Sequence, residues 1–152
     1  MLLHYGITVE YVRLIKQLYE SSSCQVVHNG KLSDPFTVKT RERQGRLLSP
    51  MIFLIVVDWV MRHTTENAET GLKWTVTNRL EDLYFADDIS LLSHSQQHAQ
   101  SKLARLAEVA GQVGLKINVN KTEVLRTNIQ NDGPIQLQGH SIRETDRFLY
   151  LG

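Results

Sequence analysis

The chain has 152 residues, the size of one domain, and 41% hydrophobic with 22% charged residues is enough for a globular core. A net charge of +1 excludes a strongly basic surface over the whole domain, so only a local basic patch could bind nucleic acid. The single cysteine, Cys24, excludes an internal disulfide and favours a reducing, intracellular compartment.

The first third of the sequence predicts a helix and then a hairpin. Apolar residues recur every three to four positions over 9–19, the period of an amphipathic helix, and Thr8 can cap it. Residues 24–39 read as two strands around Asn29-Gly30, a dipeptide in which both residues accept positive φ. This segment therefore predicts a β-hairpin.

The middle of the sequence predicts a buried helix and a short strand. Ser49 and Pro50 form a good N-cap and first-turn pair ahead of residues 51–63, which are apolar nearly all round. The longest apolar run, 51–57, is too short to cross a bilayer, and we expect neither a signal peptide nor a membrane contact. Residues 72–78 alternate as a strand does.

The last part of the sequence predicts one more helix among strands. Ser93 or Ser95 can cap this helix, and Gly114 stands where a left-handed C-terminal residue is expected. Residues 115–125 read as strand, turn and strand, and residues 135–143 as a hairpin. The predicted apolar face of the helix consists of Leu103, Leu106, Ala110 and Val113. Helices separated from antiparallel hairpins predict an α+β fold, with helices packed on one face of a sheet.

Asp87 and Asp88 stand side by side inside the apolar stretch 83–92. On one straight strand, one of the two would face the core, where an unpaired carboxylate costs several kcal/mol. We therefore expect two short strands that meet in a turn with both aspartates at its tip. Carboxylates gathered there could hold Mg²⁺, which takes one or two carboxylates plus substrate phosphates. The alternative is an Asp-rich turn with solvated charges.

The residues around this pair resemble a known family. Residues 84–88, YFADD, are similar to the FADD form of the catalytic motif of reverse transcriptases from non-LTR (LINE-type) retrotransposons. Residues 43–53 resemble that family's RQGxxLSPxLF motif, and 114–123 its GLxxNxxKTE motif. Residues 148–152, FLYLG, resemble the start of its primer-grip hairpin. The four motifs stand in the family's order and cover roughly residues 5–152.

The resemblance implies an antiparallel palm-type sheet that joins dNTPs to a DNA primer on an RNA or DNA template by two-metal phosphoryl transfer with Mg²⁺. Asp87 would ligate the metal ions, and Asp88 would support metal binding or the primer terminus. Lys121 would protonate the leaving pyrophosphate; a solvated turn lysine is the alternative. The residues that would line the nucleotide and template path are Arg43, Gln44, Gly45, Ser49 and Pro50.

A dense positive patch precedes the predicted helix and departs from the family pattern. The patch has two interpretations, contact with phosphates or a solvated basic loop. Its residues are Lys39, Arg41, Arg43 and Arg46. Arg41 and Glu42 replace the usual Gly-Val, and Arg46 replaces a residue that is usually small. Such long charged side chains beside the nucleotide path look more like drift in a relic than tuning of an enzyme.

Several other polar and aromatic residues have structural interpretations. His94 and His98 have a spacing that can bind metal, but no third ligand is evident, so we expect solvated helix residues. Asp58 is the odd charge in an apolar helix, and we expect a paired or snorkelling structural residue. Tyr84 and Phe85 are expected to pack in the core and hairpin.

The family uses a third metal-binding aspartate, in a strand reading roughly DxxKAFD that would precede Met1. We therefore expect residues 1–152 to form a partial palm, incomplete because it lacks that strand, the fingers and the thumb, and to be inactive alone. The alternative is a non-catalytic relic, or a domesticated nucleic-acid-binding or interaction module. A small metal-dependent phosphohydrolase would leave the motifs at 43–53 and 114–123 unexplained. The family allows a nuclear or a cytoplasmic location.

Overall fold

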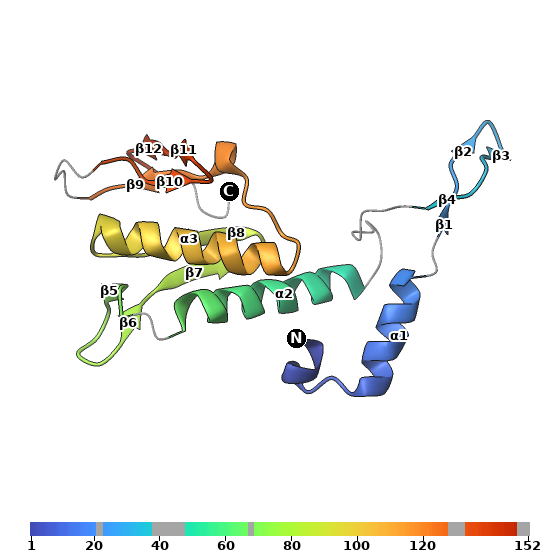
Figure 1. Cartoon of the computed structure of the whole chain (residues 1–152), viewed down its shortest axis with the longest axis horizontal. Helices are drawn as coiled ribbons and strands as arrows, with labels where there is room; N and C mark the ends of the chain where they lie inside the picture. The colour runs from blue at the N-terminus through green and yellow to red at the C-terminus, as the bar shows by residue number, and fades with distance from the viewer. Residues whose placement is uncertain (21–22, 38–47, 67–68, 128–132, 149–152) are drawn as a thin grey trace. The chain divides into compact units, whose positions relative to one another are not determined.

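The computed structural model describes residues 1–20, 23–37, 48–66, 69–127 and 133–148 (Figure 1). The chain divides into two compact units, Met1–Ile55 and Val56–Gly152, and each is described by itself. Helices and short strands occur in both units, which confirms the α+β class. The palm-type arrangement stays a prediction.

The first unit holds the predicted helix and hairpin. A short 3₁₀ helix, η1 (Leu2–Tyr5), precedes α1 (Val9–Glu20). The strands that follow are β1 (Ser23–Cys24), β2 (Val27–His28), β3 (Lys31–Leu32) and β4 (Phe36–Thr37). β2 pairs antiparallel with β3, and β1 with β4. Asn29 and Gly30 have φ of 50° and 73°, as the hairpin signal predicted.

Helix α2 (Leu48–Thr65) begins before its predicted N-cap. Ser49 is its second residue, so the prediction of Ser49 as the N-cap is wrong. Pro50 is tolerated at the third position because the first N–H groups of a helix have no intrahelical acceptor. The prediction of a helix buried all round is only partly right. Its buried residues are Val57, Val60, Met61 and Thr64, whereas Met51 and Leu54 are exposed.

Two hairpins follow α2 in the second unit. β5 (Leu72–Lys73) pairs antiparallel with β6 (Arg79–Leu80), so the predicted single strand over 72–78 is in fact the first half and turn of a hairpin. β7 (Asp82–Phe85) pairs antiparallel with β8 (Asp88–Leu91) in the register that joins Phe85 to Asp88. The expected split of the Asp-Asp stretch into two strands is confirmed.

Helix α3 (Gln96–Gln112) has the predicted signals at both ends. The Ser95 hydroxyl accepts a hydrogen bond from the His98 N–H at 3.3 Å, as expected of an N-cap. Gly114 has φ of +80°, and the Leu115 N–H returns to the Ala110 carbonyl at 2.9 Å. This is the Schellman arrangement, which satisfies carbonyls that the helix end leaves open.

The strands after α3 differ from the predicted strand, turn and strand. Residues 115–118 form no strand; η2 (Val119–Lys121) and β9 (Glu123–Leu125) follow them. The predicted hairpin is β10 (Gln136–Leu137) and β11 (His140–Ser141), and β12 (Arg143–Thr145) runs parallel to β9. Within the described residues the strands form six separate two-stranded ladders, five of them antiparallel, and not one antiparallel sheet.

The core of the second unit lies around α3, which Figure 1 shows between strands β9–β12 and the β7–β8 hairpin. Leu103 of α3 packs with Ile135, Leu137 and Ile142, and Leu91 of β8 contacts the same cluster. The buried hydrophobic side chains of the described residues all belong to this unit. Burial of an aliphatic side chain contributes about 1.5–3 kcal/mol. Of the buried hydrophobic side chains, α3 supplies Leu103, Leu106, Val109 and Ala110, and α2 supplies Val57, Val60 and Met61.

Lys102 of α3 closes the base of the β7–β8 hairpin. Its side chain is only 4% exposed, and its ammonium lies 2.5 Å from the Glu81 carboxylate. It also donates to the main-chain carbonyls of Glu81, at 3.1 Å, and Leu92, at 2.5 Å. These two residues flank the hairpin, and the Leu92 N–H donates to the Glu81 carbonyl. One ammonium with three donors thus satisfies three acceptors where β7 begins and β8 ends.

The Glu81 carboxylate is held in its charged form by this network. Burial opposes its ionisation, but hydrogen bonds from Lys102 and the Gly71 N–H, the Lys102 charge and the Thr70 hydroxyl together lower the pKa of Glu81 below its usual 4.5. The pKa of the next residue, Asp82, shifts in the opposite direction. Burial raises the pKa of Asp82, and the nearby Glu81 charge raises it further, against the Thr65 hydroxyl and Lys102.

We predict that Glu81→Gln destabilises the fold at pH 7 by about 3–5 kcal/mol, because it leaves a buried ammonium without its anion. The folded-state pKa of Glu81 lies below its unfolded value, so its stabilisation is present above about pH 4.5 and is lost as the pH falls through the folded pKa. Urea unfolding measures the free energy of unfolding of both chains at pH 7 and pH 3. The difference between Glu81→Gln and the unmodified chain should be smaller at pH 3. The matched control is Glu69→Gln, at an exposed position. An equal gap at both pH values would contradict the prediction.

Candidate active site

The two aspartates lie at the turn between β7 and β8. Ala86 and Asp87 are the two turn residues, and Asp88 begins β8 opposite Phe85. Both carboxylate side chains are exposed. The prediction that a turn carries the pair is confirmed, except that Asp88 already belongs to a strand. Two oxygen-donor side chains therefore stand at one end of a hairpin whose other end Lys102 closes.

The backbone of this turn is in an unfavourable conformation at Ala86. Its φ is +53°, a left-handed value that costs a residue with a Cβ about 1–2 kcal/mol. A positive φ at the first residue of a two-residue hairpin turn usually falls on glycine, asparagine or aspartate. Backbone strain of this kind persists where the surroundings fix the chain, and it clusters at functional sites.

A tyrosine–aspartate hydrogen bond joins β7 to α2. The Tyr84 hydroxyl donates to Asp58 at 2.8 Å, and Asp58 also pairs with Arg62 at 2.7 Å. Partial burial and the Asp58 hydrogen bond and charge raise the pKa of Tyr84. The expectation that Asp58 is a paired structural residue is confirmed. Because Tyr84 is two residues from Ala86, this bond fixes the strand that leads into the turn.

The other face of β7 is open. Leu83 and Phe85 alternate with Tyr84 and are 45% and 66% exposed. The expectation that Phe85 packs in the core is therefore wrong. The hairpin has only two strands within the described residues, so the side chains that point away from α2 meet no further layer.

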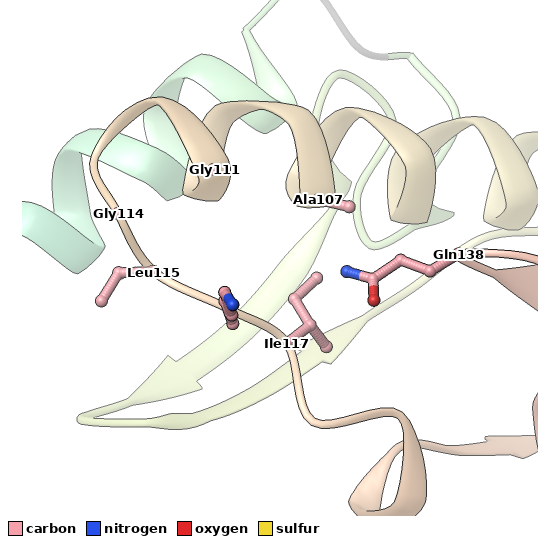
Figure 2. Close-up of a pocket in the computed structure, with 7 residues that line it drawn as sticks. Ala107, Gly111, Gly114, Leu115, Ile117 and Gln138 are labelled. Carbon is pink, nitrogen blue, oxygen red and sulfur yellow. The ribbon is translucent and has the colours of Figure 1, made fainter.

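Lys121 lies at the end of η2 and its side chain is exposed. α3 runs back beside β8, so its C-terminal end and the segment after it lie at the same end of the unit as the Asp87 turn, as both views show (Figures 1 and 2). A hollow of about 310 Å³ adjoins this segment, below the last turns of α3. Figure 2 shows Ile117 and Gln138 pointing into it. Lys116 is the charged residue of its lining, and neither aspartate lines it.

The remaining predicted substrate-binding residues belong to the first unit or lie outside the described residues. Arg43, Gln44 and Gly45 lie outside the described residues, as does the rest of the basic loop at 39–46. Ser49 and Pro50 belong to the first unit, whereas the aspartates belong to the second. Their roles along the nucleotide path stay predictions.

The donor set at the turn suits Mg²⁺ but is small. Exposed carboxylate oxygens are the ligands that this ion prefers, and it commonly takes only one or two of them. Among the described residues, no three His, Cys, Asp or Glu side chains gather closely enough to hold a metal ion. The His94 and His98 rings meet edge to face at 4.8 Å without such a third ligand. Asp87 and Asp88 are therefore the residues that fit the ion, as a pair.

The comparison with protein families decides the identity. The family described as reverse transcriptase (RNA-dependent DNA polymerase) matches residues 5–152. The chain belongs to the reverse transcriptase family. The match covers the FADD turn and the 43–53, 114–123 and 148–152 motifs, so the family resemblance of the sequence is confirmed. Within the described ranges, no helix of this reverse transcriptase chain is long and apolar enough to cross a membrane.

Retrotransposon proteins are among its relatives. A Retrovirus-related Pol polyprotein from the type-2 retrotransposable element R2DM of Drosophila melanogaster is 30% identical over 163 aligned residues, covering 97% of this chain. A Pol polyprotein from the type-1 retrotransposable element R2 of Nasonia vitripennis is 29% identical over 72% of it. A putative transposon-derived protein of Caenorhabditis elegans is 34% identical over 48% of it. The chain spans 15%, 12% and 28% of the length of these three relatives. The similarity to the two R2 Pol polyproteins supports a non-LTR retrotransposon origin.

The sequence reasoning missed the residues that hold the aspartate turn in place. Lys102, Glu81 and the bond between Tyr84 and Asp58 were not expected to act on it. One signal was present: Lys102 immediately precedes Leu103, at the edge of the predicted apolar helix face. A lysine so placed needs a buried anion, and Glu81 is the acid next to the hairpin.

We predict that Ala86→Gly raises the free energy of unfolding by about 0.5–1 kcal/mol, because glycine removes the left-handed strain at a smaller entropic cost. Ala86→Val should lower it by about 1–2 kcal/mol. Ala104→Gly is the matched control, since glycine at this exposed helical position should cost about 1 kcal/mol. Urea unfolding measures all three, and a loss of stability in Ala86→Gly would contradict the assignment of strain.

Proposed function

We propose that the chain supplies part of the catalytic centre of a retrotransposon reverse transcriptase, which extends a DNA primer with dNTPs on an RNA or DNA template. The observation that carries the proposal is the exposed Asp87–Asp88 pair at a strained, anchored turn. The chain belongs to the reverse transcriptase family, and the pair stands in that family's catalytic motif. A solvated Asp-rich turn, the alternative, needs neither a strained backbone nor side chains that anchor it. The relatives' names support the retrotransposon origin.

Each residue in this proposal has a limited role. Asp87 and Asp88 would hold Mg²⁺ through their carboxylate oxygens, and substrate phosphates would supply further oxygen ligands. When bound, a pair of such ions supplies charge stabilisation for the attacking and leaving oxygens. Tyr84 and Lys102 position the turn through Asp58 and Glu81. Lys121 donates a proton to the pyrophosphate that leaves.

Residues 1–152 alone are proposed to be inactive. A site for two dications needs more negative charge than one pair of carboxylates provides, and the described residues offer no third carboxylate near the pair. The complete site therefore needs a carboxylate that these residues do not bring. A non-catalytic nucleic-acid-binding module is the second candidate, and the same shortage of carboxylates favours it.

Primer extension separates these functions. Residues 5–152 are placed in the matching region of the Drosophila relative, with the unmodified relative as reference, and assayed with RNA template, DNA primer, dNTPs and Mg²⁺. We expect template-dependent extension by the fusion and none by residues 1–152 alone. Asp87→Asn in the fusion should reduce extension about 10²–10³-fold, since a lost metal ligand removes several kcal/mol of charge stabilisation.

The control variant is Asp34→Asn, at an exposed aspartate of the first unit, which should leave extension unchanged. Extension by residues 1–152 alone would refute their proposed inactivity. A reference that extends while the fusion does not would support the non-catalytic candidate. Equal extension by Asp87→Asn and the parent fusion would refute the role of the pair.

A further inference from the structure

We propose that the β5–β6 hairpin is a separate contact for single-stranded nucleic acid, in which Trp74 stacks on a base while Lys73 and Arg79 bind phosphates. The contact lies apart from the aspartates and needs no catalysis. The inference rests on the proposed function in one respect: nucleic acid is the polyanion that the protein is expected to meet.

Two positively charged side chains of the hairpin lie opposite each other, where an anion could bind both. Lys73 and Arg79 are direct cross-strand partners, and both are exposed. Like charges directly opposite each other on an antiparallel pair lower stability. Within the described residues neither forms an ion pair; Arg79 only reaches the Gly71 carbonyl at 3.4 Å. An anion that bridges the two cations would remove this repulsion, and a phosphodiester backbone supplies such anions.

An exposed aromatic ring stands next to these cations. Trp74 is 74% exposed, although tryptophan is highly buried on average. Proteins that bind single strands combine a positively charged surface with aromatic side chains on which bases stack. Trp74 directly follows Lys73, the last residue of β5, so the ring stands where the strand passes into the turn. Val76, at the tip, is 90% exposed and offers no ring.

The hairpin holds these side chains on a fixed backbone. The N–H groups of Trp74 and Thr75 both donate to the Asn78 carbonyl, at 3.0 and 3.1 Å, and the Asn78 N–H donates to the Thr75 hydroxyl at 2.9 Å. At the base, a Cβ on Gly71 would come within 2.2 Å of the Leu80 carbonyl oxygen, so the chain segments approach closely there. A preorganised surface loses less conformational entropy when it binds.

The hairpin and the aspartates lie at opposite ends of β7 (Figure 1). β6 leads through Glu81 into β7, and the five steps from Glu81 to Ala86 extend roughly 17 Å at a strand rise of 3.4 Å per residue. The two contacts therefore do not share side chains. The Lys102 network that closes the hairpin of the aspartates also binds the Gly71 N–H through Glu81, so both surfaces belong to one anchored unit.

Fluorescence anisotropy of labelled oligo(dT) and oligo(U) with the purified chain tests this proposal. Trp74→Ala should weaken binding about 5- to 100-fold, the loss expected for one stacked base. Lys73→Gln and Arg79→Gln should each reduce the slope of log K against log salt by about 0.7. The matched controls are Val76→Thr at the same tip and Lys31→Gln at an exposed lysine of the β2–β3 hairpin, and both should bind as the parent does.

A stability measurement distinguishes binding from folding. Lys73→Gln removes a like-charge repulsion, so its thermal unfolding midpoint should be unchanged or higher while its affinity falls. A lowered midpoint together with lost binding would refute the proposal, because the residue would then be structural. Parent-like binding by Trp74→Ala would also refute it. An equal loss of oligonucleotide binding in Val76→Thr would refute it too, because the tip would then bind through its apolar side chains. Displacement of the oligonucleotide by polyglutamate as readily as by nucleic acid would also refute it.

This test is independent of the proposed function. Asp146→Asn, at an exposed aspartate of the second unit outside both contacts, should bind oligo(dT) as the parent chain does, because it leaves the hairpin intact. Failure of primer extension by the fusion, with oligonucleotide binding by the chain preserved, would refute the proposed function and leave the hairpin contact standing. Loss of oligonucleotide binding in Asp146→Asn would refute a contact confined to the hairpin.

Discussion

The buried contact of Lys102 is the interaction on which the candidate site depends. The Lys102 side chain is 4% exposed, and the Glu81 carboxylate and two main-chain carbonyls surround its ammonium. Such a contact is costly to break, since either partner alone would be a buried charge without compensation. It connects α3, around which the core is built, to the hairpin that carries the aspartates. The position of the turn is thus set by the packing of α3.

The turn is held from a second direction by α2. The Tyr84 hydroxyl reaches Asp58, and Asp58 is itself oriented by Arg62. With its base closed by Lys102 and its strand tied to α2, the hairpin has little freedom to relax the left-handed Ala86. The strain therefore stays in the turn that carries the two exposed carboxylates. Such a turn suits a cation such as Mg²⁺, which binds one or two carboxylates.

Local signals in the sequence predicted the parts of the fold that local chemistry determines. The Asn29-Gly30 turn, the Ser95 cap, the Gly114 helix end and the split at the aspartates each follow from the conformations that one or two residues allow. Ser49 shows the limit of this reasoning, because the helix starts before a good N-cap residue and helix ends are the least sharply encoded boundaries.

Contacts between distant residues could not be predicted in this way. Glu81 and Lys102 are 21 positions apart and Asp58 and Tyr84 are 26 apart, so their pairing depends on the packing of helices and not on spacing. The single antiparallel sheet was an inference from element order, and the parallel pairing of β9 with β12 does not follow from any local pattern. The candidate site was found by its motif, whereas the residues that position it were found only in the structure.

The claim that Asp87 and Asp88 form a cation site can be measured directly on the isotope-labelled chain. Mn²⁺, added in small amounts during NMR, broadens the amide signals of residues near the ion. The account predicts that the signals of Ala86, Asp87 and Asp88 broaden first, before those of the exposed Asp34 and Asp146, and that Mg²⁺ in excess restores them. Broadening that begins at Asp34 or Asp146, or equally at all exposed carboxylates, would contradict it.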